Sequence, residues 1–174
     1  GCATGSTTEQ AIKHAVFEVI ERDAAAIWWR AKLPCPEVPA QDQSTDFILT
    51  LKKELALNGY LTCALDITND LGIPVVATIA WNQKTGKEIF IALGCDLTLA
   101  DATRKSYLEL MQRTAIVLAT CPVVSEPQHP FQIWLDNEHI DHYPQLQPYT
   151  VEPVALANVK DVNQLIQHLF KVHP

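Results

Sequence analysis

The sequence lacks the short motifs that mark the commonest nucleotide and acyl-transfer sites. It contains no G-x-x-x-x-G-K-[ST] and no G-x-G-x-x-G, so neither a P-loop nor a Rossmann dinucleotide site is indicated. It also contains no G-x-S-x-G, which argues against the nucleophile elbow of the α/β-hydrolases. Any nucleotide that binds this chain must therefore use a different architecture.

Long apolar runs and basic residues are also scarce. No apolar stretch reaches the roughly 20 residues needed to span a membrane, and no secretory leader is recognisable. The 13 lysines and arginines are outnumbered by 20 aspartates and glutamates, which gives a net charge of -7. Because nucleic acids are bound through basic residues, we expect no nucleic-acid partner. From the lack of an apolar run and of a leader, we expect no membrane contact and a cytoplasmic location.

The cysteines show no pairing pattern. All five are widely separated along the chain, and no two have C-x-x-C spacing. This spacing indicates neither a zinc site nor a redox pair. We therefore expect reduced thiols, as in cytoplasmic proteins. The cysteines are Cys2, Cys35, Cys63, Cys95 and Cys121.

The remaining composition is that of one globular domain with a core. The chain has 174 residues, of which 48% are hydrophobic and 19% charged. It opens at Gly1 without an initiator methionine, and its last predicted helix would need a further strand to cover. We therefore expect residues 1–174 to form a single partial domain that is truncated at both ends.

Helical periodicity is clearest at the start of the chain. Residues 6–9 (Ser-Thr-Thr-Glu) have the form of a capping box, and the helix that they begin should run to about Trp29. Apolar residues recur in it at helical spacing. The predicted buried stripe consists of Ile12, Val16, Val19 and Ile20, with Ala11 and Ala15 beside them.

The middle of the chain predicts an antiparallel meander of at least three strands. Residues 60–68, 75–82 and 88–93 read as strands, and two short turns connect them. Helices are expected from the caps at residues 44–46 to Gly59, at about 100–119, around 131–142 and at about 159–172. The predicted fold class is α+β, with the sheet packed against the long helices.

Two stretches of the sequence resemble each other and predict an internal repeat. Residues 1–2 (Gly-Cys) precede a helix that carries E-V-I-E-R at 18–22, and residues 94–95 (Gly-Cys) precede one that carries E-L-M-Q-R at 109–113. The offset is 93 at the glycines and 91 at the helix motif, so one two-residue gap aligns the units. Each unit is a Gly-Cys turn that leads into a helix.

The first of these helices carries a candidate cation site. His14, Glu18 and Glu21 are spaced i, i+4 and i+7 and share one helix face, and Arg22 follows directly. Two carboxylates on one face repel each other, and a cation between them removes that repulsion. Such oxygen ligands suit Mg²⁺, which takes one or two carboxylates together with substrate phosphates. Arg22 would reach a phosphate.

The alternative interpretation of this helix is a solvated face with an i,i+4 pair between Glu18 and Arg22. The second helix favours function, because Lys105, Glu109 and Gln112 repeat the same i, i+4, i+7 spacing. Two helices would then supply their oxygen ligands to one metal–phosphate cluster.

Residues 1–24 strongly resemble the YcaO family, in which a Gly-rich lead runs into a helix ending E-x-I-E-R-D-A. The opening Gly-Cys-Ala-Thr-Gly looks most like the azole-forming, SagD-like cyclodehydratase branch. Residues 94–112 look like the later family helix that ends E-x-x-Q. The resemblance covers most of residues 1 to about 115.

The resemblance implies a site for ATP and Mg²⁺. Carried over by motif, Glu18 and Glu21 would be magnesium ligands. The residues expected at the nucleotide are Glu109, Gln112, Arg22, Arg113 and His14. One departure concerns Arg113: the family often reads E-x-x-Q-x-R, whereas here Arg113 directly follows Gln112 and Thr114 takes the later position.

The activity implied for the parent protein is ATP-dependent cyclodehydration of a ribosomally made precursor peptide, in complex with a partner protein. Cys, Ser or Thr side chains of the peptide would form thiazoline or oxazoline rings, and the fragment alone would be inactive. One alternative is a non-catalytic scaffold of a bacteriocin biosynthesis complex that takes up peptide by strand addition. Others are thioamidation and ribosomal protein methylthiolation. Exposed sheet edges would also permit a homodimer.

Overall fold

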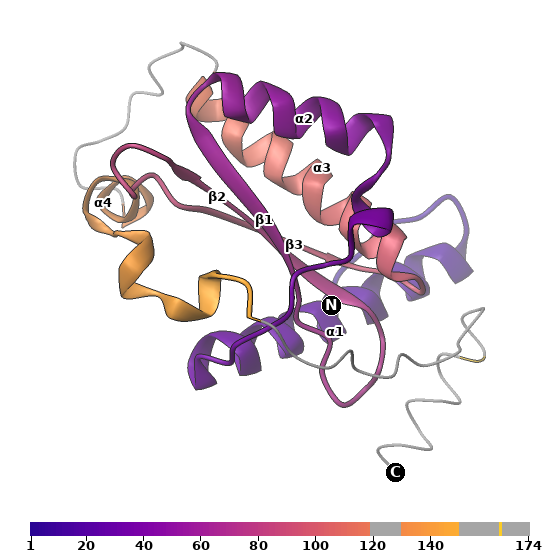
Figure 1. The fold of residues 1–174 in the computed structure, drawn as a ribbon. Helices are drawn as coiled ribbons and strands as arrows, with labels where there is room; N and C mark the ends of the chain where they lie inside the picture. The colour runs from indigo at the N-terminus through magenta and orange to yellow at the C-terminus, as the bar shows by residue number, and fades with distance from the viewer. Residues whose placement is uncertain (119–129, 150–163, 165–174) are drawn as a thin grey trace.

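The computed structural model describes residues 1–118, 130–149 and 164 of the chain (Figure 1). Its helices are α1 (Thr8–Ala31), α2 (Asp46–Leu57), α3 (Leu99–Leu118) and α4 (Pro130–Asn137). Its strands are β1 (Tyr60–Asp66), β2 (Val75–Asn82) and β3 (Phe90–Cys95), and short 3-10 helices lie at Ala40–Gln43, Ile140–His142 and Pro144–Leu146. The helix predicted at 159–172 lies outside the described residues except at Gln164, which is helical. None of the described helices is long and apolar enough to cross a bilayer.

The sheet is the predicted antiparallel meander, with strand order β1-β2-β3. The third strand begins two residues later than predicted, because the chain before it does not pair as a strand. Glu88 lies in the left-handed region with φ 54°, and the carbonyl of Lys87 accepts a turn hydrogen bond from Asn82 at 2.9 Å. Ladder pairing with β2 therefore starts at Phe90, opposite Ala80.

Helices cover both faces of the sheet, with α1 on one face and α2 and α3 on the other (Figure 1). Successive side chains of a strand point to opposite faces, so residue parity decides which helix each one meets. Cys63 and Ile79 pack in the core beneath α1. Ala64 and Ala80 pack in the second core beneath α2 and α3. The two motif-bearing helices α1 and α3 thus lie on opposite sides of the sheet.

The first turn of α1 is capped with the chemistry predicted but one residue later. Thr7 is the N-cap, and its hydroxyl accepts from the backbone N–H of Gln10 at 3.2 Å. The side-chain oxygen of Gln10 accepts in turn from the N–H of Ser6 at 3.1 Å. The cap therefore uses a Thr and a Gln in place of the predicted Ser and Glu, and the Gln accepts from the residue before the N-cap.

The predicted buried stripe of α1 is correct at Ile20 but wrong at Ile12 and Val19, whose side chains are 45% and 53% exposed. Apolar residues occur on two faces of α1, and the face with the large aromatic rings turns to the sheet because those rings bury the most area. The buried residues of α1 are Phe17, Ile20, Ala24 and Trp28. Ile12 and Val19 instead line a groove of about 520 Å³ that also contains Leu71.

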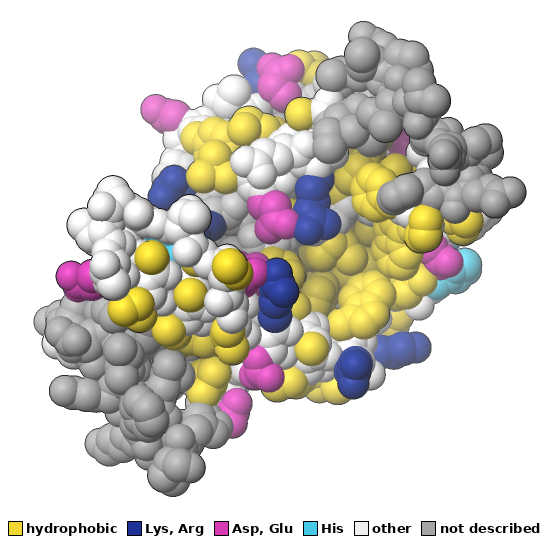
Figure 2. All heavy atoms as spheres, turned by 180° about the vertical axis from the view of Figure 1, so that it is seen from behind, with side chains coloured by type: hydrophobic (Ala, Val, Ile, Leu, Met, Phe, Trp, Pro, Cys, Tyr) yellow, Lys and Arg dark blue, Asp and Glu magenta, His cyan; other side chains and the backbone are white. Residues whose placement is uncertain are grey.

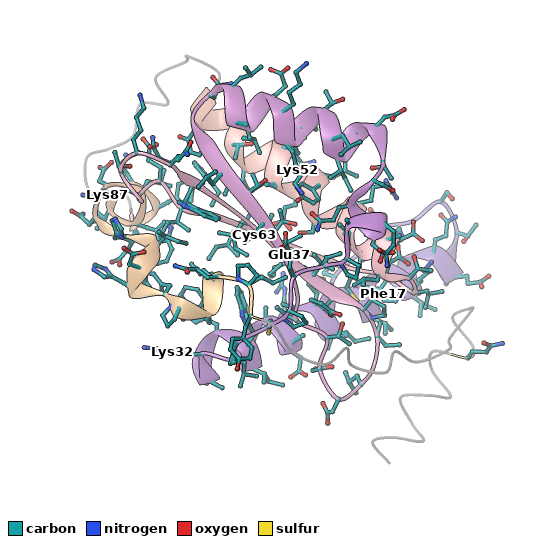
Figure 3. All side chains as sticks on the ribbon, viewed as in Figure 1. Phe17, Lys32, Glu37, Lys52, Cys63 and Lys87 are labelled. Carbon is teal, nitrogen blue, oxygen red and sulfur yellow. The ribbon has the colours of Figure 1, made fainter. Side chains whose placement is uncertain are left out.

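A buried glutamine in the segment before α2 connects that segment to α2 and α3. The side-chain oxygen of Gln43 accepts from Lys52 of α2 at 2.8 Å and from the hydroxyl of Tyr107 of α3 at 3.0 Å. Its amide group donates to the carbonyl of Val38 at 2.6 Å. Figure 3 shows Lys52 on α2. A polar group this deeply buried must be hydrogen-bonded, and Gln43 has partners for both ends of its amide.

The outer edge of β1 is covered by the chain segment that precedes α2. The N–H of Val38 donates to Ala64 at 2.8 Å, and the N–H of Asp66 donates to the carbonyl of Pro36 at 2.9 Å. This segment occupies the edge of β1 at residues 64–66, so an added strand could not pair there. Cys2, Cys35, Cys63 and Cys95 are free thiols, as predicted, and Cys121 lies outside the described residues.

Candidate functional site

The candidate site lies along the outer edge of β3, where α1 and α3 flank the strand from opposite faces. Gly94 allows α3 to lie directly on β3. A Cβ at this position would lie 2.3 Å from the carbonyl oxygen of Ala102 and 2.5 Å from the amide nitrogen of Ser106. Any other residue would push the helix away from the strand and move the side chains that α3 carries.

On α1, the Glu18 carboxylate is held by two different groups. Its Oε2 atom accepts from the backbone N–H of Cys2 at 2.8 Å, and its Oε1 atom pairs with the Arg22 guanidinium at 2.5 Å. One turn earlier, Nδ1 of His14 lies 2.9 Å from the carbonyl oxygen of Thr4. These contacts fix the segment at residues 2–4 against the helix.

On α3, the Glu109 carboxylate is held in the same manner. Its Oε2 atom accepts from the backbone N–H of Leu93 at 3.0 Å, and its Oε1 atom accepts from Nε of Arg113 at 2.9 Å. Lys105 donates to the carbonyl oxygen of Cys95 at 3.1 Å. Glu109 and Lys105 therefore occupy backbone groups on the outer edge of β3, where an added strand would have to pair.

The contacts of the two helices have identical sequence separations. Each glutamate bonds an N–H 16 residues earlier and an arginine 4 residues later. His14 and Lys105 each contact a carbonyl 10 residues earlier. Each residue of one set therefore corresponds to a residue of the other set at an offset of 91 positions, with no gap.

The two Glu–Arg pairs are weakly bound because they face solvent. The Arg22 side chain is 73% exposed and the Arg113 side chain is 45% exposed. Exposed pairs of this kind contribute roughly 0–1 kcal/mol each. The guanidinium groups therefore move away from the carboxylates at little cost, whereas the backbone hydrogen bonds keep the carboxylates in place.

Glu21 links the two helices electrostatically. Burial raises the pKa of its carboxyl to about 7, and the negative charge of Glu109 adds to this rise. The charges of Lys105 and Arg22 act in the opposite direction, and that of Glu18 acts weakly in the same direction as Glu109. The predicted carboxylates of α1 and α3 are therefore close enough for their charges to interact, although their helices lie on opposite faces.

Asp96, directly after β3, joins the two helices through a pair of lysines. Its carboxylate lies 3.5 Å from Lys13 of α1 and 2.9 Å from Lys105 of α3. Both ammonium groups also lie over the ring of Phe17, at 5.3 and 5.0 Å from its centroid. Phe17 is labelled in Figure 3. This cluster holds α1, α3 and the end of β3 together beside the glutamates.

One face of the molecule gathers hydrophobic side chains, and acidic and basic side chains lie beside them (Figure 2). Ile91 and Leu93 of β3 and Trp29 of α1 are among the partly buried apolar residues that pack against the α1 core.

The residues present suit a magnesium–phosphate group bound through few protein ligands. Among the described residues, no three His, Cys, Asp or Glu side chains converge closely enough to enclose a metal ion. Mg²⁺ characteristically takes one or two carboxylates and completes its shell with water and phosphate oxygens. The mutual repulsion of Glu21 and Glu109 is the situation that a divalent cation relieves.

The structure places the predicted residues unequally. Glu18 with Arg22, and Glu109 with Arg113, form the two pairs, and Glu21 is a partly buried residue of α1 on which the charge of Glu109 acts. His14 contacts the backbone, and Gln112 is exposed on α3.

Sequence reasoning missed Lys13 and Asp96. Neither residue belongs to a recognisable motif, and their contact is visible only because α1 packs beside the end of β3 in the structure. The one available signal was the position of Asp96 directly after a strand that leads into a motif helix.

A sequence model of the family described as YcaO cyclodehydratase, ATP- and Mg2+-binding, matches residues 1–169 of this chain. The match includes both motif helices and every residue that the structure describes. The chain belongs to the YcaO family.

Solved structures share this fold. A heterocyclase in complex with substrate and cofactor has a TM-score of 0.77 and 24% identity over 98% of this chain and 23% of its own. YcaO from Methanopyrus kandleri, bound with AMPPCP and Mg2+, has a TM-score of 0.66 and 18% identity over 97% of this chain and 46% of its own. The E. coli microcin synthetase McbBCD complex with pro-MccB17 bound has a TM-score of 0.61 and 14% identity over 96% and 46%. The chain thus spans less than half the length of these solved chains, and at such identities the likeness establishes the fold alone.

Proposed function

We propose that the protein containing this chain uses ATP and Mg²⁺ to activate backbone amides of a ribosomally made precursor peptide, so that Cys, Ser or Thr side chains close azoline rings. The observation that carries the proposal is the interaction of Glu21 with Glu109 at the outer edge of β3. Burial and the charge of Glu109 together outweigh the charges of Lys105 and Arg22, so the ionised form of Glu21 is disfavoured there. A bound Mg²⁺ would supply further positive charge at this point.

The roles of the residues follow from their contacts. Glu18 and Glu21 would hold the cation, Glu109 would be shared between the cation and the nucleotide, and Gln112 would lie toward the nucleotide. Arg22 and Arg113 are exposed guanidinium groups at the same edge and suit phosphate oxygens. His14 acts at a distance, because its ring contacts the backbone at Thr4 and so holds the segment that orients Glu18.

The chemistry expected of such a site is positioning and charge neutralisation. Bound ATP supplies the phosphoryl group that turns the amide oxygen into a leaving group. The contribution of the chain is to hold carboxylates at fixed positions through backbone N–H groups and to place lysine and arginine charges nearby. None of these side chains needs to form a covalent bond to the peptide.

We further propose that the two units are an internal repeat of 91 residues. The shared separations of the three contact pairs support it, since independent helices have no reason to match in all three. The alignment pairs Cys2 with Leu93 and Thr4 with Cys95, so the predicted two-residue gap is unnecessary. The turn predicted at residues 94–95 is wrong, because both residues belong to β3. Glu21 then corresponds to Gln112, which makes the two halves of the site chemically different.

A non-catalytic peptide scaffold is less well supported. Its basis was an open sheet edge, whereas the β1 edge is occupied by the segment around Val38, and Glu109 and Lys105 bond to the edge of β3. Thioamidation and methylthiolation share the same proposed ATP site and stay alternatives. A partner protein that presents the precursor peptide belongs to the proposal for the whole protein.

Calorimetry with Mg-ATP tests the proposal. The whole protein is titrated beside the 174-residue chain and a Glu18→Ala, Glu21→Ala variant. We expect micromolar binding by the whole protein and a loss of at least about 100-fold in the variant, because two charge-bearing ligands are removed. An exposed carboxylate elsewhere on α1, Glu9→Ala, is the matched control. Equal binding by all forms, or binding by none, would contradict the proposed site.

A further inference from the structure

Each of the two glutamates has one oxygen that is fixed and one that is replaceable. The Oε2 atoms of Glu18 and Glu109 accept backbone N–H groups at 2.8 and 3.0 Å. The Oε1 atoms are occupied by Arg22 and Arg113, whose side chains are mostly or partly in solvent. The backbone bond therefore sets the orientation of each carboxylate whether or not the arginine is present.

A divalent cation and the arginine would compete for the same oxygen. Mg²⁺ binds carboxylate oxygen at about 2.0–2.1 Å and demands near-ideal octahedral geometry. The Oε1 atom of Glu109 already accepts from both Nε and Nη2 of Arg113, at 2.9 and 2.5 Å. Two cations this close to one oxygen repel each other, so that entry of the metal favours departure of the guanidinium.

We propose that Arg22 and Arg113 are resident counter-ions of Glu18 and Glu109, which Mg²⁺ displaces and which then bind the nucleotide phosphates. The proposal rests on the proposed function and adds to it a coupling between cation and phosphate. Before the cation arrives, the arginines neutralise the carboxylates and the phosphates have no free guanidinium. After it arrives, the same arginines are released at the position where phosphate charge is added.

This coupling predicts that removal of either arginine raises the affinity for Mg²⁺ and lowers the affinity for ATP. Arg22→Gln and Arg113→Gln should strengthen binding of Mg²⁺ alone by about two- to fivefold, since a competing exposed ion pair is lost. The same variants should weaken binding of ATP at saturating Mg²⁺ by about tenfold or more, since charge-assisted phosphate bonds are lost. A purely structural role would weaken both.

The measurement is calorimetric titration of MgCl₂ alone and then of ATP at saturating Mg²⁺, with the whole protein as wild type, each single variant and the double variant. Arg30→Gln on α1 and Arg104→Gln on α3 are the controls, because both arginines are exposed and the change in charge is the same. Arginine Nε–H resonances in NMR spectra of the wild type provide a second readout. The Arg113 signal should move on addition of Mg²⁺, and the Arg104 signal should not.

The outcomes separate the two proposals. Gains in Mg²⁺ affinity that exceed those of both controls, with losses in ATP affinity, support displacement. Unchanged or weaker Mg²⁺ binding in the Arg22 and Arg113 variants overturns it, even where wild type binds Mg-ATP and the proposed function stands. Stronger Mg²⁺ binding by the variants with no ATP binding by any form supports displacement of the arginines but overturns their binding to nucleotide, together with the proposed function. A wild type that binds no Mg²⁺ overturns both.

Discussion

Glu21 of α1 and Glu109 of α3 lie near enough for the charge of Glu109 to act on Glu21, although their helices cover opposite faces of the sheet. Burial raises the pKa of Glu21 to about 7, and the negative charge of Glu109 contributes to that rise. Because β3 is the last described strand of the sheet, α1 and α3 approach each other at its outer edge, where Lys13 and Lys105 share Asp96.

The first prediction concerns the stability of the metal-free chain as a function of pH. The pKa of Glu21 is about 7 in the folded chain, against an ordinary value of 4.5, so the folded state binds the extra proton between these values. The contribution of this group is fully present below pH 4.5 and is lost as pH rises through 7, by at most roughly 3 kcal/mol. Glu21→Gln should remove that loss and make the chain more stable than wild type at pH 8.

Urea unfolding at about pH 5, 6, 7 and 8 in the presence of a chelator measures the effect. Glu9→Gln, an exposed carboxylate of the same helix, is the control and should follow wild type. Addition of Mg²⁺ at pH 8 should stabilise wild type and leave Glu21→Gln nearly unchanged. A wild type whose stability rises from pH 5 to pH 8 by the same amount as that of Glu21→Gln would contradict the assignment.

The second prediction concerns Asp96. Burial raises the pKa of this carboxyl, but the hydrogen bond from Lys105, the N–H of Leu97 and the charge of Lys13 outweigh burial and lower the pKa below 3.8. Asp96→Asn should destabilise the chain by about 1–3 kcal/mol at pH 7, because two lysines lose a largely buried counter-ion. The contribution is present above the unfolded pKa and is lost as pH falls through the folded pKa, so the variant and wild type should converge in acid.

A double-mutant cycle isolates the ion pair from other effects of the substitution. Asp96→Asn is combined with Lys105→Met, and chemical unfolding gives the coupling free energy. Asp136→Asn, an exposed aspartate of α4, is the control for loss of one negative charge. A coupling free energy of zero would mean that the 2.9 Å contact contributes nothing to stability.

Sequence periodicity was sufficient for the meander and for the positions of α1, α2 and α3, because turn residues and alternation are local signals. The helix predicted around 131–142 is shorter, since α4 ends at Asn137. Periodicity was insufficient for the orientation of α1. Val19 and Ile20 are both apolar, and the sequence offers two apolar faces, of which only one meets the sheet. The choice depends on how Phe17 fits over the opposing strands, which is a tertiary property.

Neighbouring substitutions on α1 test this orientation directly. Ile20 is 3% exposed and Val19 is 53% exposed. Ile20→Ala should cost about 2–4 kcal/mol of unfolding free energy through lost burial and a cavity, whereas Val19→Ala should change it by less than about 0.5 kcal/mol. Thermal and urea unfolding of the two variants measure the difference. Equal costs would indicate that the groove beside Val19 is filled in solution.

The candidate site was predictable as residue types but not as a set of contacts. Glutamates three apart followed by arginine are a local pattern, and their recurrence was visible in the sequence. The pairing of Glu18 with Cys2 and of Glu109 with Leu93 was not, because each joins a side chain to a backbone group 16 residues away. Such contacts depend on how tightly each helix folds back on the segment before it, and no periodicity records that.

The last prediction concerns the role of Glu109 at the edge of β3. Its Oε2 atom accepts from the Leu93 N–H at 3.0 Å, so that it satisfies a donor that would otherwise be open to a strand from another molecule. Glu109→Ala should expose that donor, speed hydrogen exchange at the Leu93 amide by about tenfold and promote self-association. Glu109→Gln keeps an acceptor oxygen and should do neither, although it lowers affinity for a cation. Amide exchange and sedimentation velocity of both variants distinguish the effect of the hydrogen bond from that of the charge. Equal association of both variants would mean that the lost charge is the cause. Association of the alanine variant alone would mean that the hydrogen bond keeps the edge of β3 closed.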